Sequence, residues 1–123
     1  MNNIFSKVAA KICVPTQTGF NILKLEEIIY CEAARSYTTF HLINDKKVTI
    51  SNPLAHYEKI LCDGTFFRVH KSFLINFLHI KEYWRGNGGI AIMSNSKEIE
   101  VSRRRKESFL AKIEESLIYL KAS

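Results

Sequence analysis

The sequence predicts a single, mainly β domain of short antiparallel strands, with one short internal helix and one helix at the C-terminal end. Two observations lead to this fold class. Short apolar and β-branched runs recur along most of the chain, separated by turn-forming residues. Helical spacing of apolar residues is found only after Ser51 and after Ser102. There is no internal repeat and no linker rich in proline or serine.

The first strands are expected to form hairpins. Residues 11–14 and 20–25 flank Pro15–Gly19, a turn-forming stretch, and the run 28–33 is rich in strand formers and is expected to cross the core. The small residues that follow end this pattern and leave Arg35 and Ser36 at a loop tip. A further hairpin is expected from residues 37–43, 44–46 and 47–50, as strand, turn and returning strand.

The spacing of apolar residues changes after Ser51. Asn52 is a candidate N-cap, Pro53 suits the first helical position, and Asp63–Gly64 reads as a stop. Between them the apolar residues at helical spacing are Leu54, Tyr57 and Leu61. We therefore expect a short helix that packs this stripe against a sheet.

The stretch Phe66–Asn76 is the most unusual segment. As an extended strand it would have an apolar row interrupted only by Lys71, and Arg68 and His70 would share the opposite face. The chain must bend or bulge near Lys71 to keep its ammonium group in water, which would push Lys71 and Ser72 outwards. A lysine beside a hydroxyl suits contact with a phosphate or a base edge, but a solvated lysine on an edge strand explains the same residues.

The C-terminal third begins with a hairpin of residues 80–84 and 90–93, whose loop 85–89 contains three glycines that can supply positive φ values. A short strand is expected at 98–101 and an amphipathic helix at 102–120, with Ser102 as its N-cap. The apolar positions of this helix are Phe109, Leu110, Ile113, Leu117 and Leu120.

Composition limits the function classes. The chain has 123 residues, and its 18 Lys and Arg against 12 Asp and Glu give a formal net charge of +6, which favours a polyanionic partner without naming one. No signal peptide or transmembrane run is visible, so we expect a cytoplasmic protein. The cysteines Cys13, Cys31 and Cys62 are expected to be reduced, buried thiols, and neither they nor the histidines have the spacing of a zinc site.

Three corners pair cations with short hydroxyl groups where strand patterns end. They are Arg35–Tyr37, Lys71–Ser72 and Ser102–Lys106. The last has four consecutive cations in the first turn of the expected helix, where they oppose the positive end of the helix dipole. A sequence that breaks a local rule marks a candidate functional site. Arginines at this corner suit phosphate contact and bidentate hydrogen bonding to guanine. The alternative is a solvated run of charges.

These residues also resemble a known family. The segments that carry the resemblance are Ile28–Ala33, Phe66–Asn76, His79–Ile80 and Val101–Arg104. Over about residues 11–113, and most specifically in the pattern R-x-H-[KR]-S-[FY]-L-x-N at Arg68–Asn76, the chain is similar to the LytTR family of bacterial DNA-binding domains. The resemblance implies an elongated set of short antiparallel strands in small sheets, with loops entering the major groove. We expect the domain at 11–120. Residues 1–10 have no firm pattern and are expected to be a disordered or helical lead-in.

The resemblance also implies the site residues. Base-reading positions of the family fall on Ser36 or its neighbour Arg35, on Lys71 and on Arg104. Ser36 stands where many relatives carry Asn, so the base read there does not follow from the family. The candidate DNA-binding residues are Arg35, Ser36, Tyr37, His70, Lys71, Ser72, Arg103, Arg104 and Arg105. For His70, an internal hydrogen bond that shapes the bend is as well supported as DNA contact, and Asn76 is expected to contact phosphate or support the structure.

The implied partner is double-stranded promoter DNA, bound as direct repeats with a second copy on the adjacent repeat. Such domains are usually the output half of two-component response regulators, in a phosphorelay from a histidine kinase. The receiver domain is not in this sequence, so we expect either an excised C-terminal domain or a stand-alone regulator. No cofactor, metal or membrane partner is implied.

Two other classes stay open. A basic β domain with Tyr37, Phe40 and Trp84 could stack single-stranded bases, although these aromatics also suit a core. The apolar stripe of the last helix could pair with a partner protein, although such stripes more often pack on their own sheet. For an enzyme, His70 and Ser72 lack a third partner or a nucleophile elbow, so no catalysis is expected.

Overall fold

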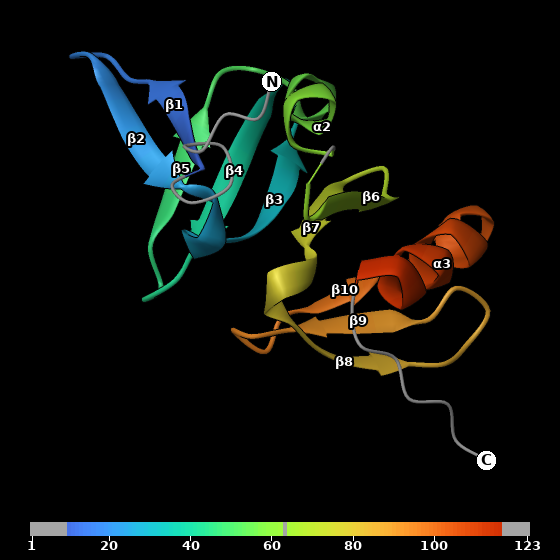
Figure 1. The fold of residues 1–123 in the computed structure, drawn as a ribbon. Helices are drawn as coiled ribbons and strands as arrows, with labels where there is room; N and C mark the ends of the chain where they lie inside the picture. The colour runs from blue at the N-terminus through green and yellow to red at the C-terminus, as the bar shows by residue number, and fades with distance from the viewer. Residues whose placement is uncertain (1–9, 63, 117–123) are drawn as a thin grey trace, which may run out of the picture.

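The protein is described by a computed structural model, which places residues 10–62 and 64–116 and gives a mainly β fold (Figure 1). The strands are β1 (Lys11–Pro15), β2 (Phe20–Lys24), β3 (Ile28–Ala34), β4 (Tyr37–Leu42), β5 (Lys47–Ile50), β6 (Phe66–His70), β7 (Phe73–Asn76), β8 (Ile80–Trp84), β9 (Ile90–Met93) and β10 (Glu98–Glu100). The helices are α2 (Leu54–Leu61) and α3 (Lys106–Ser116), with 3-10 turns η1 (Leu25–Glu27), η2 (Phe77–His79) and η3 (Arg103–Arg105). The expected lead-in lies largely outside the described residues.

The strands form three antiparallel sheets. A central sheet has the order β5-β4-β3-β7-β6, the β1–β2 hairpin is separate, and β10-β9-β8 make the third sheet. In Figure 1 the β1–β2 hairpin lies at the upper left and β8–β10 with α3 at the lower right, with the central sheet between them. The predicted fold class is confirmed.

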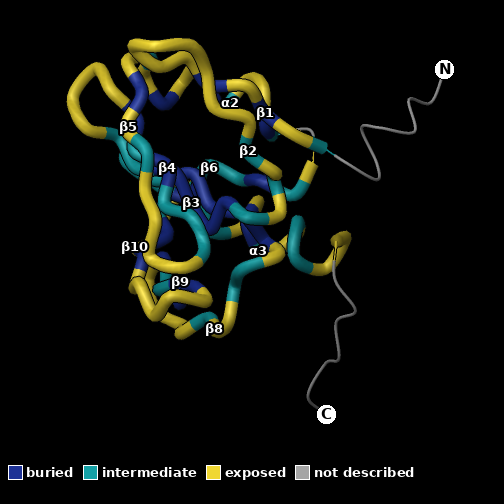
Figure 2. Tube along the Cα trace, turned by 90° about the vertical axis from the view of Figure 1, so that its left-hand side faces the viewer, coloured by how far each residue is buried: buried dark blue, intermediate teal, exposed yellow. Residues whose placement is uncertain are grey.

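The central sheet is covered on both faces, because its strands alternate between two apolar clusters. One cluster joins β1 and α2 to the sheet and includes Ile12, Val14, Phe40, Tyr57, Phe66 and Leu74. The other joins the β8–β10 sheet and α3 to the opposite face and includes Val69, Ile75, Met93, Val101 and Phe109. Figure 2 shows the resulting buried centre at β3, β4 and β6, with exposed turns around it.

Asn76 fixes the central sheet to the preceding part of the chain. It is completely buried. Its amide nitrogen donates to the carbonyls of Leu25 and Ile28 at 3.2 and 2.9 Å. Its amide oxygen accepts from Thr65 Oγ1 at 2.7 Å and from the Leu78 backbone at 3.1 Å. All of the hydrogen-bonding capacity of the amide is therefore used, as a buried polar group requires.

The structure corrects three local expectations. Phe66–Asn76 is a hairpin, with Lys71 and Ser72 as its turn. Arg68 and His70 each pair with a residue of β7, and Val69 forms a bulge between them. The residue at the N-cap of α2 is Pro53, not Asn52, whose amide instead donates to the Tyr57 hydroxyl. The apolar stripe expected on this helix is buried.

The third correction concerns the C-terminal helix. The segment after Ser102 first makes η3, and α3 begins only at Lys106 and is described as far as Ser116. The consecutive arginines therefore precede the α-helix rather than occupy its first turn, which contains Glu107. This lessens the predicted conflict with the helix dipole. The expected positions Leu117 and Leu120 lie outside the described residues.

Candidate nucleic-acid interface

The three predicted corners lie at one side of the molecule. The β3–β4 turn at Arg35–Ser36 and the β6–β7 turn at Lys71–Ser72 are neighbours, because β3 pairs with β7 and the Ala33 amide donates to the Ser72 carbonyl at 2.9 Å. The third corner joins them through the Ser102 amide, which donates to the Val69 carbonyl at 2.8 Å. The fold thus brings together segments that are far apart in the sequence.

The Lys71 turn is held in place by Arg68. The Arg68 side chain is only 15% exposed. It donates from Nε to the His70 carbonyl at 2.8 Å and from one terminal nitrogen to the Lys71 carbonyl. The other terminal nitrogen meets Oε1 of Glu58, on α2, at 2.6 Å. Arg68 therefore fixes the backbone of the turn and leaves the exposed Lys71 side chain at its tip.

His70 also supports this turn. Its Nδ1 accepts a hydrogen bond from the Ser72 amide at 3.1 Å, which closes the turn from within. Its Nε2 lies 3.5 Å from Oε1 of Glu100, on the neighbouring β10. The internal hydrogen bond is the first of the two roles expected for His70, and it orients the backbone of Ser72.

The Arg35 turn has an unusual backbone. Arg35 has a φ of 60°, a left-handed conformation that is uncommon outside glycine, asparagine and aspartate. Arg35 and Ser36 form the two-residue connection between the paired residues Ala34 and Tyr37, and the turn is exposed. The Tyr37 side chain is 49% exposed beside it. A cation, a hydroxyl and a phenol therefore stand together at this tip.

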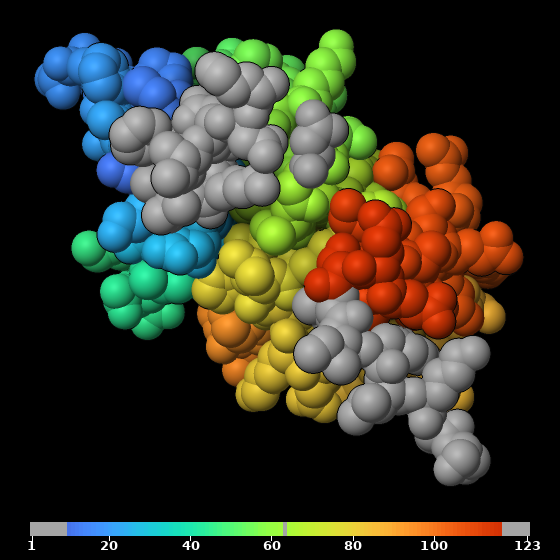
Figure 3. All heavy atoms as spheres, viewed as in Figure 1, coloured from blue at the N-terminus to red at the C-terminus, as the bar shows by residue number. Residues whose placement is uncertain are grey.

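The arginines of η3 have different environments. Arg103 and Arg104 are exposed. The guanidinium of Arg105 instead donates to the Arg68 carbonyl at 3.1 Å, so it braces the strand that leads to the Lys71 turn. In the space-filling view the red atoms of α3 lie beside orange atoms of the preceding part of the chain (Figure 3). This packing buries Phe109 and holds η3 at the surface.

The nine predicted residues thus divide into two sets. The exposed cations and polar tips are Arg35, Ser36, Tyr37, Lys71, Arg103 and Arg104. The partly buried members are His70, Ser72 and Arg105, which make hydrogen bonds within the protein. The sequence prediction missed the supporting pair Arg68 and Glu58; the shared face of Arg68 and His70 indicated the first, and no local signal indicated the second.

The cysteines differ from expectation at one position. Cys31 is buried and Cys62 is half-buried, but Cys13 is exposed and all three are free thiols. Cys13 lies between Ile12 and Val14 on β1, and since alternate residues of a strand face opposite ways, the burial of these two turns Cys13 outwards.

Among residues 10–62 and 64–116, no group of His, Cys, Asp and Glu is arranged to hold a metal ion. None of the described helices has the length and apolar character needed to span a membrane.

Comparison with known proteins supports a DNA-binding assignment. Residues 19–114 match the LytTr DNA-binding domain family. The chain is 32% identical over 114 residues to the transcriptional regulatory protein LytR of Staphylococcus aureus strain MW2, which covers 91% of this chain and 46% of that protein. It is 30% identical over 95 residues to the sensory transduction protein LytT of Bacillus anthracis, covering 76% of this chain and 38% of that protein. The chain therefore spans less than half of the length of these relatives.

A solved structure supports the fold. A LytTr DNA-binding domain from Bacillus cereus superposes with a TM-score of 0.68, covering 84% of this chain and 94% of that one, at 24% sequence identity. The expectation of a DNA-binding domain rather than an enzyme agrees with the family match. With both the sequence match and the fold in agreement, this chain belongs to the LytTR family of DNA-binding domains.

Proposed function

We propose that the chain binds a specific double-stranded DNA sequence and is the output domain of a bacterial transcription regulator. One observation carries this proposal: the three cationic turns, from distant parts of the chain, share one side of the fold through the amides of Ala33 and Ser102. Such a discontinuous surface suits a duplex, which offers base edges in the groove and phosphates on either side. The same interpretation is supported by the relatives' names, which are transcriptional regulatory protein for LytR and sensory transduction protein for LytT.

The exposed tips have the chemistry for reading bases. Arg104 suits bidentate hydrogen bonds to guanine, and Lys71 suits its O6 or N7 atoms. Arg35 or Ser36 reads a further position, and Tyr37 and Arg103 contact phosphates. His70, Ser72 and Arg105 act mainly by holding the turns. The proposal also includes binding by two copies on adjacent direct repeats. It further includes a cytoplasmic location and control by a kinase through a receiver domain.

The alternative of single-strand binding is weakened by Phe40, which is completely buried and has no face to offer a base. Tyr37 and Trp84, each 49% exposed, remain available for stacking. The alternative of a protein-interaction stripe is weakened by Phe109, which is buried against the chain's own sheets.

The proposal is tested by selecting bound sequences from a random duplex library and titrating the winner against scrambled duplex at two salt concentrations. We expect a short repeated sequence that outcompetes scrambled DNA by orders of magnitude, with affinity that falls steeply with salt. Equal competition by duplex, single strand and other polyanions would contradict sequence-specific duplex binding.

A further inference from the structure

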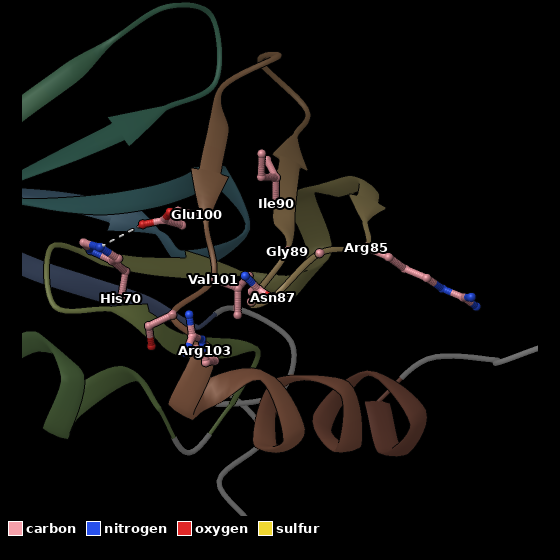
Figure 4. A pocket seen from close by; sticks show the side chains of 11 residues that line it. His70, Arg85, Asn87, Gly89, Ile90, Glu100, Val101 and Arg103 are labelled. Atoms are coloured by element: carbon pink, nitrogen blue, oxygen red, sulfur yellow. Dashed lines mark ion pairs between the residues drawn. The ribbon is translucent and has the colours of Figure 1, made fainter.

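A surface groove borders the candidate interface. Its volume is about 490 Å³. One side is made by His70 and the segment Glu100–Arg103, and the other by the β8–β9 loop, residues 85–89 (Figure 4). The groove is therefore continuous with the Lys71 turn and with η3, but its second wall comes from a loop outside the three corners.

The loop is fixed against the basic corner. A Cβ added at Gly88 would lie 1.8 Å from the Val101 carbonyl oxygen, so only glycine permits this approach. The Val101 amide donates to the Gly89 carbonyl at 2.9 Å, and the Tyr83 hydroxyl donates to the Gly88 carbonyl at 2.7 Å. Lys106 Nζ reaches the Gly86 carbonyl at 3.1 Å. Of the three loop glycines, only Gly89 has the positive φ value that the sequence predicts, at 97°.

The groove has a cation on each of its two sides. Arg103 stands on the η3 side, and Arg85 extends from the loop away from His70 and Glu100 (Figure 4). Arg85 is exposed and makes no ion pair within the described residues. Asn87, also exposed, offers a neutral hydrogen-bond donor between them. The lining contains one acidic side chain, Glu100, which faces His70 at 3.5 Å.

We propose that this groove receives one sugar–phosphate strand of a bound nucleic acid, with Arg85 as a phosphate contact beyond the predicted interface. Because the Arg85 side chain extends away from His70 and Glu100, Arg85 and Arg103 do not converge on one point, as a single bound anion would need (Figure 4). An extended polyanion meets both cations along its length. The loop is already held in place, so little conformational freedom is lost on binding. This inference rests on the proposed function for the identity of the strand as DNA, but phosphate contact itself does not depend on base sequence.

The test compares Arg85→Gln with Lys81→Gln in the full chain. Lys81 is exposed near the start of β8, at the opposite end of the strand from the loop, so both variants lose one charge from the same hairpin. We expect Arg85→Gln to lower affinity about fivefold for selected and scrambled duplex alike, and to reduce the slope of log affinity against log salt by about 0.9. Lys81→Gln should retain nearly the wild-type slope.

A second variant tests the opposite charge. Glu100→Gln removes the carboxylate that a passing strand must approach, so it should strengthen binding to both duplexes. Equal slopes for Arg85→Gln and Lys81→Gln, with Glu100→Gln unchanged, would overturn the inference. If the wild-type chain showed no preference for any sequence, the proposed function would be rejected. A smaller salt slope for Arg85→Gln on scrambled duplex would even then support phosphate contact in the groove.

Discussion

The guanidinium of Arg68 meets Oε1 of Glu58 at 2.6 Å and thereby ties the hairpin that presents Lys71 to helix α2. The same guanidinium binds the carbonyls of His70 and Lys71. A single side chain thus connects α2, whose apolar stripe is buried, with the exposed tip of the hairpin. Because two of its acceptors are backbone carbonyls of the turn, the position of Lys71 depends on an arginine that need not contact any ligand.

We expect Arg68→Ala to lower the free energy of unfolding by about 2 to 3 kcal/mol, since it leaves a partly buried carboxylate and two turn carbonyls without their donor. Urea denaturation measures this, with Lys59→Ala on an exposed part of α2 as the control. Folded Arg68→Ala should also bind the selected duplex more weakly. Wild-type stability in this variant would show that the three hydrogen bonds contribute little.

Arg104→Ala should cost about 1 to 3 kcal/mol of affinity for the selected duplex and relax the preference at one base position, as loss of a bidentate guanine contact would. Repeating the library selection with the variant reads out that position. Lys46→Ala removes a charge from the exposed β4–β5 turn and should keep the full preference. An equal loss on scrambled duplex would instead make Arg104 a phosphate contact.

Asn76→Ala should lower the free energy of unfolding by about 2 to 4 kcal/mol, because it leaves buried donors and acceptors unpaired and opens a small cavity. Asn21→Ala, an exposed position on β2, should change it by less than about 0.5 kcal/mol. Thermal or urea unfolding distinguishes the two. A small effect at Asn76 would mean that water replaces the amide.

The thiols should react with an aromatic disulfide reagent in three distinct ways. Cys13 is exposed and should react first. Burial raises the pKa of Cys62 to about 11, so little thiolate is present at neutral pH and its reaction should be slow. Burial also raises the pKa of Cys31, which should react only after unfolding. Cys13→Ser should remove the fast phase; a fast phase that survives would place another thiol at the surface.

Local patterns in the sequence predicted most of the elements, because turn residues and apolar periodicity are short-range signals. The β1–β2 hairpin, the stripe of α2 and the β8–β9 hairpin follow from them. The bulge expected near Lys71 and the exposed Lys71 are also present, but the bend is a turn between two strands rather than a kink in one strand. The bulge at Val69 shifts the alternation and makes the hairpin resemble one bent strand in the sequence. A lysine in an apolar row was the visible sign of that turn.

Long-range contacts explain what the sequence could not predict at the site. The meeting of the three corners depends on the pairing of β3 with β7 and on the Ser102 amide, which bonds to a residue more than thirty positions earlier. The same holds for Arg105, whose partner is the Arg68 carbonyl. A run of consecutive arginines gives no indication of which member turns inwards.

Arg35→Gly separates stability from binding at the first corner. The left-handed φ of 60° destabilises an L-residue by about 1 to 2 kcal/mol but does not destabilise glycine. In the opposite direction, glycine loses more backbone entropy on folding. We therefore expect the free energy of unfolding to stay the same or rise by up to about 1 kcal/mol, while affinity for the selected duplex falls. Arg35→Ala is the matched control: it removes the same side chain but keeps the strain, so it should bind as weakly as Arg35→Gly and be less stable.

Denaturation and duplex titration of both variants give the comparison. If Arg35→Gly binds like the wild type, the left-handed turn serves the fold alone, and Ser36 becomes the residue to test at this tip.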